Sequence, residues 1–178
     1  MNKPWKTVKK NIIYQNKYGY TLYDNDVINP AGKKGKYMVL ENHDFVVIIA
    51  ITPEKKIVMI RQWRYPIDRE SLELPAGSID AGEDKLKCAK RELLEETGYS
   101  SSEWSEIKSY WIGNGAIKIK GRIFLAKNAI KTDDTNHEET ENIVSELYSY
   151  PELERMIENN FIDDERSLIG LLLLPKYL

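Results

Sequence analysis

Three glutamates of one short segment, Glu92, Glu95 and Glu96, are the side chains best suited to chemistry. On an α-helix, which turns about 100° per residue, these three positions lie within one arc of about 100°. Like charges at this spacing destabilise an isolated helix by roughly 0.2–0.5 kcal/mol per pair unless a cation lies beside them. Hard cations such as Mg²⁺ prefer oxygen ligands and commonly take phosphate oxygens as well. The cluster therefore predicts a divalent-metal site for a phosphorylated compound.

The spacing of the surrounding residues distinguishes a metal site from a solvated acidic surface, which is the commoner meaning of a charge run. From residue 77 to residue 99 the chain reads GSIDAGEDKLKCAKRELLEETGY. This segment resembles the Nudix box, G-x5-E-x7-R-E-U-x-E-E-x-G-U, where U is a bulky aliphatic residue. Every charged and glycine position matches, and the departure is Tyr99 at a packing position. A match of this length is a specific signal of the Nudix family.

Other segments resemble one branch of that family, the ADP-ribose pyrophosphatases. Residues 62–66 (QWRYP) and 72–77 (LELPAG) are similar to the branch's segments before the box, and residues 139–143 (ETENI) to its late E-x-E-x-I segment. Residues 110–115 (YWIGNG) depart from it, because they stand where the branch commonly has a Ser-Pro-Gly-like turn. This loop is expected to approach the distal part of the substrate, so the departure leaves the sugar open.

The resemblance implies which residues bind metal. Glu92 and Glu96 would hold two or more Mg²⁺ or Mn²⁺ ions, and Glu96 would thereby be catalytic. Glu95, Glu141 and the backbone carbonyl of Ala76 would add further contacts. Four other residues of the motif would have a structural role and bind no metal: Gly77, Glu83, Arg91 and Gly98. Among these, the Arg91 and Glu83 side chains would be joined by a charge-assisted hydrogen bond.

The base that accepts a proton from the attacking water is expected within residues 137–141. Carboxylates saturated by metal are poor bases, so a separate carboxylate is required, and the resemblance implies Glu139. Glu138 is a rival, and so is His137, because a neutral imidazole can also accept a proton near pH 7. A solvated acidic turn is the ordinary alternative for this segment.

Arg64 is the cation expected against the phosphates or ribose of the substrate, with Glu73 nearby for hydroxyl recognition. Arg61 is equally available for this role. Three aromatic residues are candidates for stacking on the base: Trp63, Tyr65 and Trp111. Aromatic residues more often pack in a core or an interface, which stays the alternative for all three.

The implied reaction is metal-assisted attack of water on the pyrophosphate of a nucleoside diphosphate sugar, with ADP-ribose giving AMP and ribose 5-phosphate. GDP-mannose or another nucleotide hexose is the rival substrate. A nucleotide-sugar-binding regulator without turnover is the rival of a different class, although the intact glutamates argue against it. An RNA-processing hydrolase would need a basic channel, for which Lys33, Lys34 and Lys36 are weak support.

Hydrophobic patterning predicts the elements that position these residues. The apolar runs 45–51 and 57–61 are expected to form a central hairpin. A helix is expected to open at residues 80–83 and to end at Gly98 as its C-cap. Strands are also expected at residues 107–112, 117–126 and 143–150, and helices at residues 151–159 and 164–174.

These elements predict an α/β (α+β) fold, and the resemblance implies a Nudix-type α/β/α sandwich with a mixed sheet. Residues 1–42 are expected to form a small antiparallel β lobe, and residues 43–178 the Nudix hydrolase domain. The lobe resembles the element through which members of this branch pair their subunits. A homodimer is therefore expected.

The composition excludes other classes of protein. The 26 Lys+Arg and 28 Asp+Glu give a formal charge of -2, which suggests neither a nucleic-acid nor a membrane binder. The expected partner is therefore a small-molecule nucleotide sugar. Cys88 is the one cysteine, so it is expected as a buried thiol of the helix rather than a metal ligand. No apolar run approaches the roughly 20 residues that cross a bilayer, and no signal core follows the N-terminus, so the cytoplasm is expected.

Overall fold

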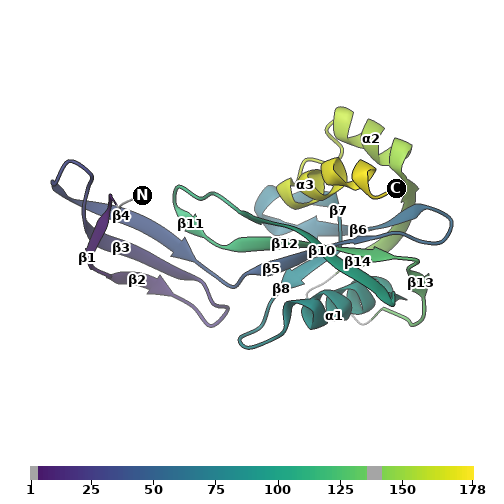
Figure 1. The fold of residues 1–178 in the computed structure, drawn as a ribbon, viewed down its shortest axis with the longest axis horizontal. Helices are drawn as coiled ribbons and strands as arrows, with labels where there is room; N and C mark the ends of the chain where they lie inside the picture. Colours follow the sequence, from purple (N-terminus) through teal and green to yellow (C-terminus); the bar gives the residue numbers. More distant parts are fainter. Residues whose placement is uncertain (1–3, 136–141) are drawn as a thin grey trace. The chain divides into compact units, whose positions relative to one another are not determined.

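The computed structural model describes residues 4–135 and 142–178. The chain divides into two compact units (Figure 1). The first contains Met1–Asp44 and Tyr110–Lys120, and the second contains Phe45–Ser109 and Gly121–Leu178. The predicted boundary followed residue 42, whereas the return of Tyr110–Lys120 to the first unit has no signal in the sequence.

The first unit is a five-stranded sheet. Its strands are β1 (Lys6–Lys9), β2 (Ile12–Gln15), β3 (Thr21–Ile28), β4 (Lys34–Glu41) and β11 (Ile117–Lys118). β3 pairs antiparallel with β1, β2 and β4, and β11 pairs parallel with β4. Every residue of β1 and β2 is exposed, so this sheet has little core of its own.

The second unit contains two larger sheets and a small ribbon. The first sheet is mixed, in the order β10-β12-β5-β8, and the second is antiparallel, in the order β14-β6-β7. The strands of the mixed sheet are β5 (Phe45–Ala50), β8 (Ala76–Ser78), β10 (Glu103–Trp111) and β12 (Lys120–Lys127). Those of the antiparallel sheet are β6 (Lys56–Arg64), β7 (Arg69–Glu73) and β14 (Ile143–Ser149). The ribbon pairs β9 (Tyr99–Ser100) with β13 (Ile130–Lys131).

The expected central hairpin of residues 45–51 and 57–61 is wrong. β5 and β6 meet only at one isolated bridge between Ile51 and Ile57, and then diverge into different sheets. β12 pairs with β5 along its whole length, and β8 takes the other edge at Phe45–Val47, beyond which the Ile48 N–H donates to the Pro75 carbonyl. The first part of β5 therefore has no edge for β6, which pairs instead with β14 and β7.

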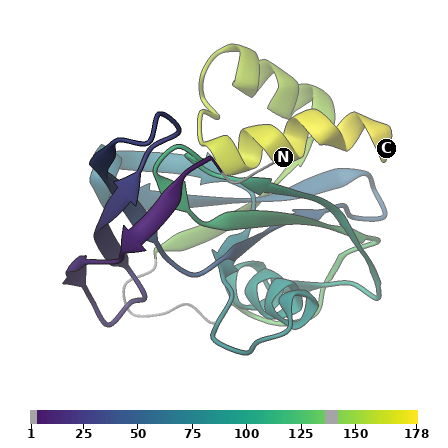
Figure 2. The same ribbon diagram turned by 60° about the vertical axis from the view of Figure 1, so that its left-hand side comes forward.

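Helices cover both faces of the sheets of the second unit, which confirms the predicted α/β arrangement. The helices are α1 (Lys85–Thr97), α2 (Tyr150–Glu158) and α3 (Glu165–Leu173), with short 3₁₀ turns η1 (Tyr65–Ile67) and η2 (Leu174–Lys176). Figures 1 and 2 both show α1 on one side of the strands and α2 and α3 on the other. In the part of the chain that the structure describes, no helix is long and apolar enough to span a membrane.

The ends of α1 are fixed by local chemistry. The helix begins after Asp84, whose side chain accepts hydrogen bonds from the backbone N–H groups of Leu86 and Lys87, rather than at residues 80–83 as predicted. The predicted start of the helix lay too early in the sequence because residues 80–83 form a turn, with Gly82 at φ 81°. Gly98 ends the helix at φ 72°, the left-handed conformation expected of a C-cap glycine.

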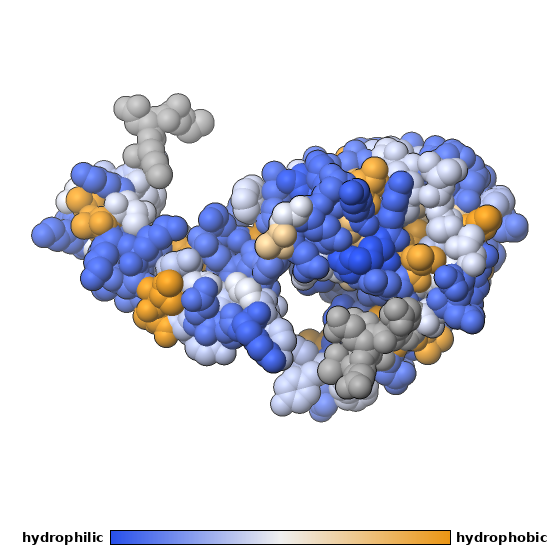
Figure 3. Space-filling view, turned by 90° about the horizontal axis from the view of Figure 1, so that it is seen from below, coloured by the Kyte–Doolittle hydropathy of each residue, from blue (hydrophilic) through white to orange (hydrophobic). Residues whose placement is uncertain are grey.

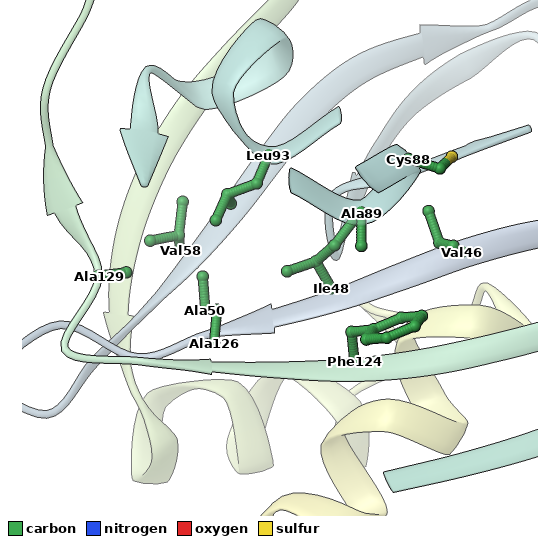
Figure 4. Close-up of a cluster of buried hydrophobic side chains, with 10 residues drawn as sticks. All are labelled: Val46, Ile48, Ala50, Val58, Cys88, Ala89, Leu93, Phe124, Ala126 and Ala129. Atoms are coloured by element: carbon green, nitrogen blue, oxygen red, sulfur yellow. The ribbon is translucent and has the colours of Figure 1, made fainter. Parts of the chain in front are cut away.

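A buried cluster attaches α1 to the sheets (Figure 4). The helix contributes Cys88, Ala89 and Leu93, and the strands contribute residues that include Val46 and Phe124. Burial and the nearby carboxylates raise the pKa of the Cys88 thiol to about 12. Cys88 is therefore a packing residue, as expected. With this face of α1 fixed, the glutamates of the next turns are held in one orientation.

The helix α3 is attached to the segment between β7 and β8. The Ser167 hydroxyl accepts a hydrogen bond from the backbone N–H of Leu74 at 2.7 Å, and both residues are buried. Gly170 permits this close approach, because a Cβ there would lie 2.5 Å from the Leu74 Cδ1. The start of α3 is thus anchored beside Glu73, the last residue of β7.

Candidate active site

The first strand residues of β8 and the last turns of α1 form one site. The Ala76 N–H donates a hydrogen bond to the Glu96 Oε2 at 3.0 Å. The Glu92 carboxylate lies against Gly77, where an added Cβ would be 1.9 Å from the Glu92 Cδ. Glu96 is buried, at 5% relative exposure. The structure therefore brings together the glutamates and the loop that the sequence assigned to the metal site.

Arg91 organises the carboxylates beside it. Its Nε and Nη2 groups donate to the two Glu83 oxygens at 3.0 and 3.2 Å, so the predicted charge-assisted hydrogen bond is present. Its Nη1 group lies 2.7 Å from Glu92 and 3.0 Å from Glu95. The Arg91 hydrogen bonds hold the pKa of Glu83 below its usual value against the opposing effect of burial. One guanidinium therefore offsets part of the negative charge of three carboxylates, two of which belong to α1.

The donor set fits a hard divalent cation. Mg²⁺ usually takes one or two protein carboxylates and completes its shell with waters and substrate phosphates. Glu92 and Glu96 supply two such carboxylates, since both lie against the segment at Ala76 and Gly77, whereas the Glu95 side chain is 39% exposed. Within residues 4–135 and 142–178, no group of three or more His, Cys, Asp or Glu side chains forms a ready metal cage. Glu92 and Glu96 by themselves leave coordination positions that waters and substrate phosphates would complete.

Arg64, at the end of β6, forms a bidentate ion pair with Glu73. Its Nε donates to the Glu73 Oε1 at 2.8 Å and its Nη2 to the Oε2 at 2.5 Å. The Glu73 hydrogen bonds raise the pKa of Arg64, against the effect of burial and with smaller contributions from Glu96 and Asp164. Arg64 therefore lies within electrostatic range of the Glu96 carboxylate.

Arg61 lies in a different environment, although it is on the same strand. Its Nε and Nη2 groups donate to Glu146 at 2.9 and 3.1 Å, and its Nη2 group also contacts the Tyr148 hydroxyl at 3.3 Å. Successive residues of a strand point to opposite faces, and Arg61 and Arg64 are three positions apart, so they project to opposite sides of β6. Arg64 is the one whose charge is coupled to the site at Glu96.

Asp164 is a site residue that sequence reasoning missed. It is the N-cap of α3 and accepts hydrogen bonds from the N–H groups of Arg166 and Ser167 at 3.0 and 3.1 Å. Burial raises its pKa, the hydrogen bond from Ser167 opposes this effect, and the charge of Glu73 adds to it. An aspartate before a helix is a recognisable cap in the sequence, but its proximity to Glu73 and Arg64 arises only from the docking of α3.

Other predicted residues either lie outside the described residues or are exposed. Glu139, Glu141 and their rivals Glu138 and His137 lie outside the described residues. The aromatic candidates are all exposed rather than in the core: Trp63 at 53%, Tyr65 at 88% and Trp111 at 52%. Trp111 belongs to the first unit. The assignments of a base and of a stacking residue stay predictions.

Comparison with known proteins decides the family. The NUDIX domain model matches residues 42–167, which is more than half of the chain. The chain belongs to the Nudix family. This result confirms the interpretation of the segment from Gly77 to Tyr99, whose charged positions form the contacts described above.

Relatives and a solved structure agree with this assignment. An ADP-ribose pyrophosphatase of Bacillus subtilis (strain 168) is 36% identical over 122 residues, which cover 68% of this Nudix chain and 65% of the relative. A methanol dehydrogenase activator of Bacillus methanolicus is 34% identical over 129 residues, covering 72% and 69% of the two chains. The structure of an ADP compounds hydrolase superposes with a TM-score of 0.86 at 19% identity, covering 98% of this chain and 94% of the other. The last match confirms the predicted fold.

Proposed function

We propose that this protein is a divalent-metal-dependent pyrophosphohydrolase of nucleoside diphosphate sugars, with ADP-ribose as the first candidate substrate. The observation that carries the proposal is the convergence of Glu92 and Glu96 on the loop at Ala76 and Gly77, with the charge of Arg64 coupled to it. Anionic pyrophosphate is the complementary ligand for such a combination of metal-binding carboxylates and a cation. The name of the Bacillus subtilis relative supports ADP-ribose among the possible sugars.

Each residue has a proposed role. Glu92 and Glu96 would hold two or more Mg²⁺ or Mn²⁺ ions, assisted by Glu95, Glu141 and the carbonyl of Ala76. The ions would supply neutralisation of the phosphate charge and activation of water. Arg64 would bind a phosphate oxygen of the substrate, and the Glu139 carboxylate would accept the proton of the attacking water. The water oxygen would form a bond to one phosphorus as the bridging P–O bond to the other phosphate breaks, and that other phosphate would leave on the second product.

We also propose that the first unit pairs two copies of the chain. Hydrophobic patches interrupt the hydrophilic surface of this unit, which is on the left in Figure 3. Large apolar side chains of β1 and β2 are more than half exposed, namely Val8 at 59%, Ile12 at 56%, Ile13 at 58% and Tyr14 at 58%. Exposed apolar surface of this kind is typical of an interaction site. Sedimentation equilibrium of the full chain should give twice the mass of 20.7 kDa, and a monomer at micromolar concentration would contradict the proposal.

A substrate panel tests the proposed activity. The panel contains ADP-ribose, GDP-mannose, UDP-glucose, NADH and diadenosine polyphosphates, each with Mg²⁺ or Mn²⁺, and products are identified chromatographically. We expect ADP-ribose to be cleaved fastest, to AMP and ribose 5-phosphate, and we expect excess EDTA to abolish turnover reversibly. Faster cleavage of GDP-mannose would overturn the choice of sugar alone. Binding of a nucleotide sugar without any turnover would favour the regulator.

A further inference from the structure

One face of the β6–β7 hairpin is polar at the end nearest the site. Gln62 lies opposite Ser71, and Arg64 opposite Arg69, while Glu73 lies two residues beyond Ser71 on the same strand. Directly opposite residues of an antiparallel pair point to the same face, and so do alternate residues along each strand. These five side chains therefore share one face of the hairpin. Their shared position explains how Arg64 reaches Glu73 across the strands.

The Glu73 carboxylate is enclosed by donors from this face. Arg64 donates to both of its oxygens, and the Gln62 Nε2 donates to Oε2 at 3.4 Å. Burial raises the pKa of Glu73, but the hydrogen bonds and charge of Arg64, together with a hydrogen bond from Ser71, outweigh this effect and leave it below the usual value. At 4% relative exposure, the ionised carboxylate is directed to its protein donors rather than to a ligand in solvent.

Arg64 presents a defined edge after this pairing. A guanidinium carries five N–H donors in a rigid fork. Glu73 takes the Nε–H and one N–H of Nη2, so the edge formed by Nη1 and the second Nη2 hydrogen faces away from Glu73. The Arg64 side chain is 36% exposed, so solutes reach it. Two parallel N–H groups match the spacing of two phosphate oxygens.

Other charged groups near Arg64 also act on the orientation of its guanidinium, and Glu73 has to hold the guanidinium against them. Arg69 lies directly opposite it, and like charges in that position repel. Glu96 and Asp164 attract it from other directions. Arg69 is held by its own ion pair, with the exposed carboxylate of Asp163. Without Glu73, the guanidinium of Arg64 would turn toward the other carboxylates and lose its orientation.

We propose that Glu73 is a positioning residue, which orients Arg64 for a phosphate of the substrate instead of hydrogen-bonding a substrate hydroxyl itself. The inference rests on the proposed function, and it changes the role that the sequence suggested for Glu73. Preorganisation of a cation improves affinity because less side-chain freedom is lost on binding. Glu73 therefore acts through Arg64, and its effect disappears when Arg64 is absent.

A double-mutant cycle tests this dependence. The variants are Glu73→Gln, Arg64→Ala and the two combined, with KM and kcat measured on ADP-ribose and the affinity for inorganic pyrophosphate measured by calorimetry without metal. We expect Glu73→Gln to raise KM and weaken pyrophosphate binding about tenfold, with kcat changed less. In the Arg64→Ala background the same change should have less than about a twofold effect. Glu146→Gln is the matched control, because it breaks the bidentate pair of Arg61 on the opposite face of β6 and should leave both affinities unchanged.

Other outcomes would overturn the inference. Additive effects in the cycle would show that Glu73 acts independently of Arg64. If Glu73→Gln removed the preference for ADP-ribose over its deoxyribose analogue while Arg64→Ala did not, Glu73 would contact the hydroxyl directly. Glu73→Asp repeats the cycle with the charge retained if the glutamine variant does not fold. Absence of turnover in the unmodified protein would refute the proposed function alone, since the pyrophosphate cycle still tests the role of Glu73.

Discussion

Replacing Glu96 by glutamine is expected to lower metal-dependent turnover by roughly 10²- to 10³-fold, as loss of one strong electrostatic contact to a reacting group typically does. The substitution removes the negative charge but keeps the size of the side chain and one amide oxygen. That oxygen still accepts the hydrogen bond from the Ala76 N–H, which joins the loop to α1 at 3.0 Å. The fold is therefore retained while the affinity for the cation falls. Turnover of ADP-ribose as a function of Mg²⁺ concentration measures both effects.

A matched variant separates loss of the ligand from loss of charge in general. Glu154→Gln makes the same chemical change at an exposed position of α2 and should leave turnover and its Mg²⁺ dependence unaltered. Thermal unfolding of both variants should stay close to that of the unmodified protein. If Glu96→Gln retained full turnover with the same Mg²⁺ dependence, Glu96 would have no place in the metal site.

The geometry of the candidate metal site was predictable because its information is local. The spacing of Glu92 and Glu96, the packing positions Ala89 and Leu93, and the closing Gly98 all lie within one helix and its caps. Helical periodicity and cap chemistry depend on neighbours in the sequence, so they specify which face of α1 is buried and which carries the carboxylates. The side chains of Ala89 and Leu93 are fully buried, and Gly98 has the expected positive φ.

The contacts that sequence reasoning missed are those between distant strands. The run 45–51 has the composition of a buried strand, but nothing in it specifies β12 and β8 as its neighbours in place of β6. One strand was expected over residues 117–126, whereas the structure divides this run into β11 and β12, and the pairing of β11 with β4 joins Tyr110–Lys120 to the first unit. Likewise, Arg64 and Glu73 were expected near each other, but a direct ion pair between them requires the register of the β6–β7 hairpin.

The Gly77→Ala variant is expected to separate the fold from the metal site. An alanine Cβ at this position would lie 1.9 to 2.3 Å from the atoms of the Glu92 carboxyl group, which is closer than any real contact. The nearest atoms belong to the end of a flexible side chain, so Glu92 moves and the strand stays. A displacement of about 1 Å in a catalytic group commonly costs about 10²-fold in rate. We expect turnover to fall by that order and the Mg²⁺ requirement to shift to higher concentration.

The free energy of unfolding of Gly77→Ala should remain near that of the unmodified protein. Alanine in place of glycine restricts the unfolded chain, and this effect stabilises the fold by about 0.4–1 kcal/mol where the backbone is compatible. Gly35→Ala is the control, since Gly35 lies in β4 with nothing within 4 Å of the added Cβ and no positive φ. Binding of Mn²⁺ followed by electron paramagnetic resonance reports the site directly, and urea unfolding reports the fold. Unchanged Mn²⁺ affinity in Gly77→Ala would mean that the Glu92 carboxylate binds no metal at its position against Gly77. The geometry at Gly77 instead requires a weaker Mn²⁺ affinity together with an intact fold.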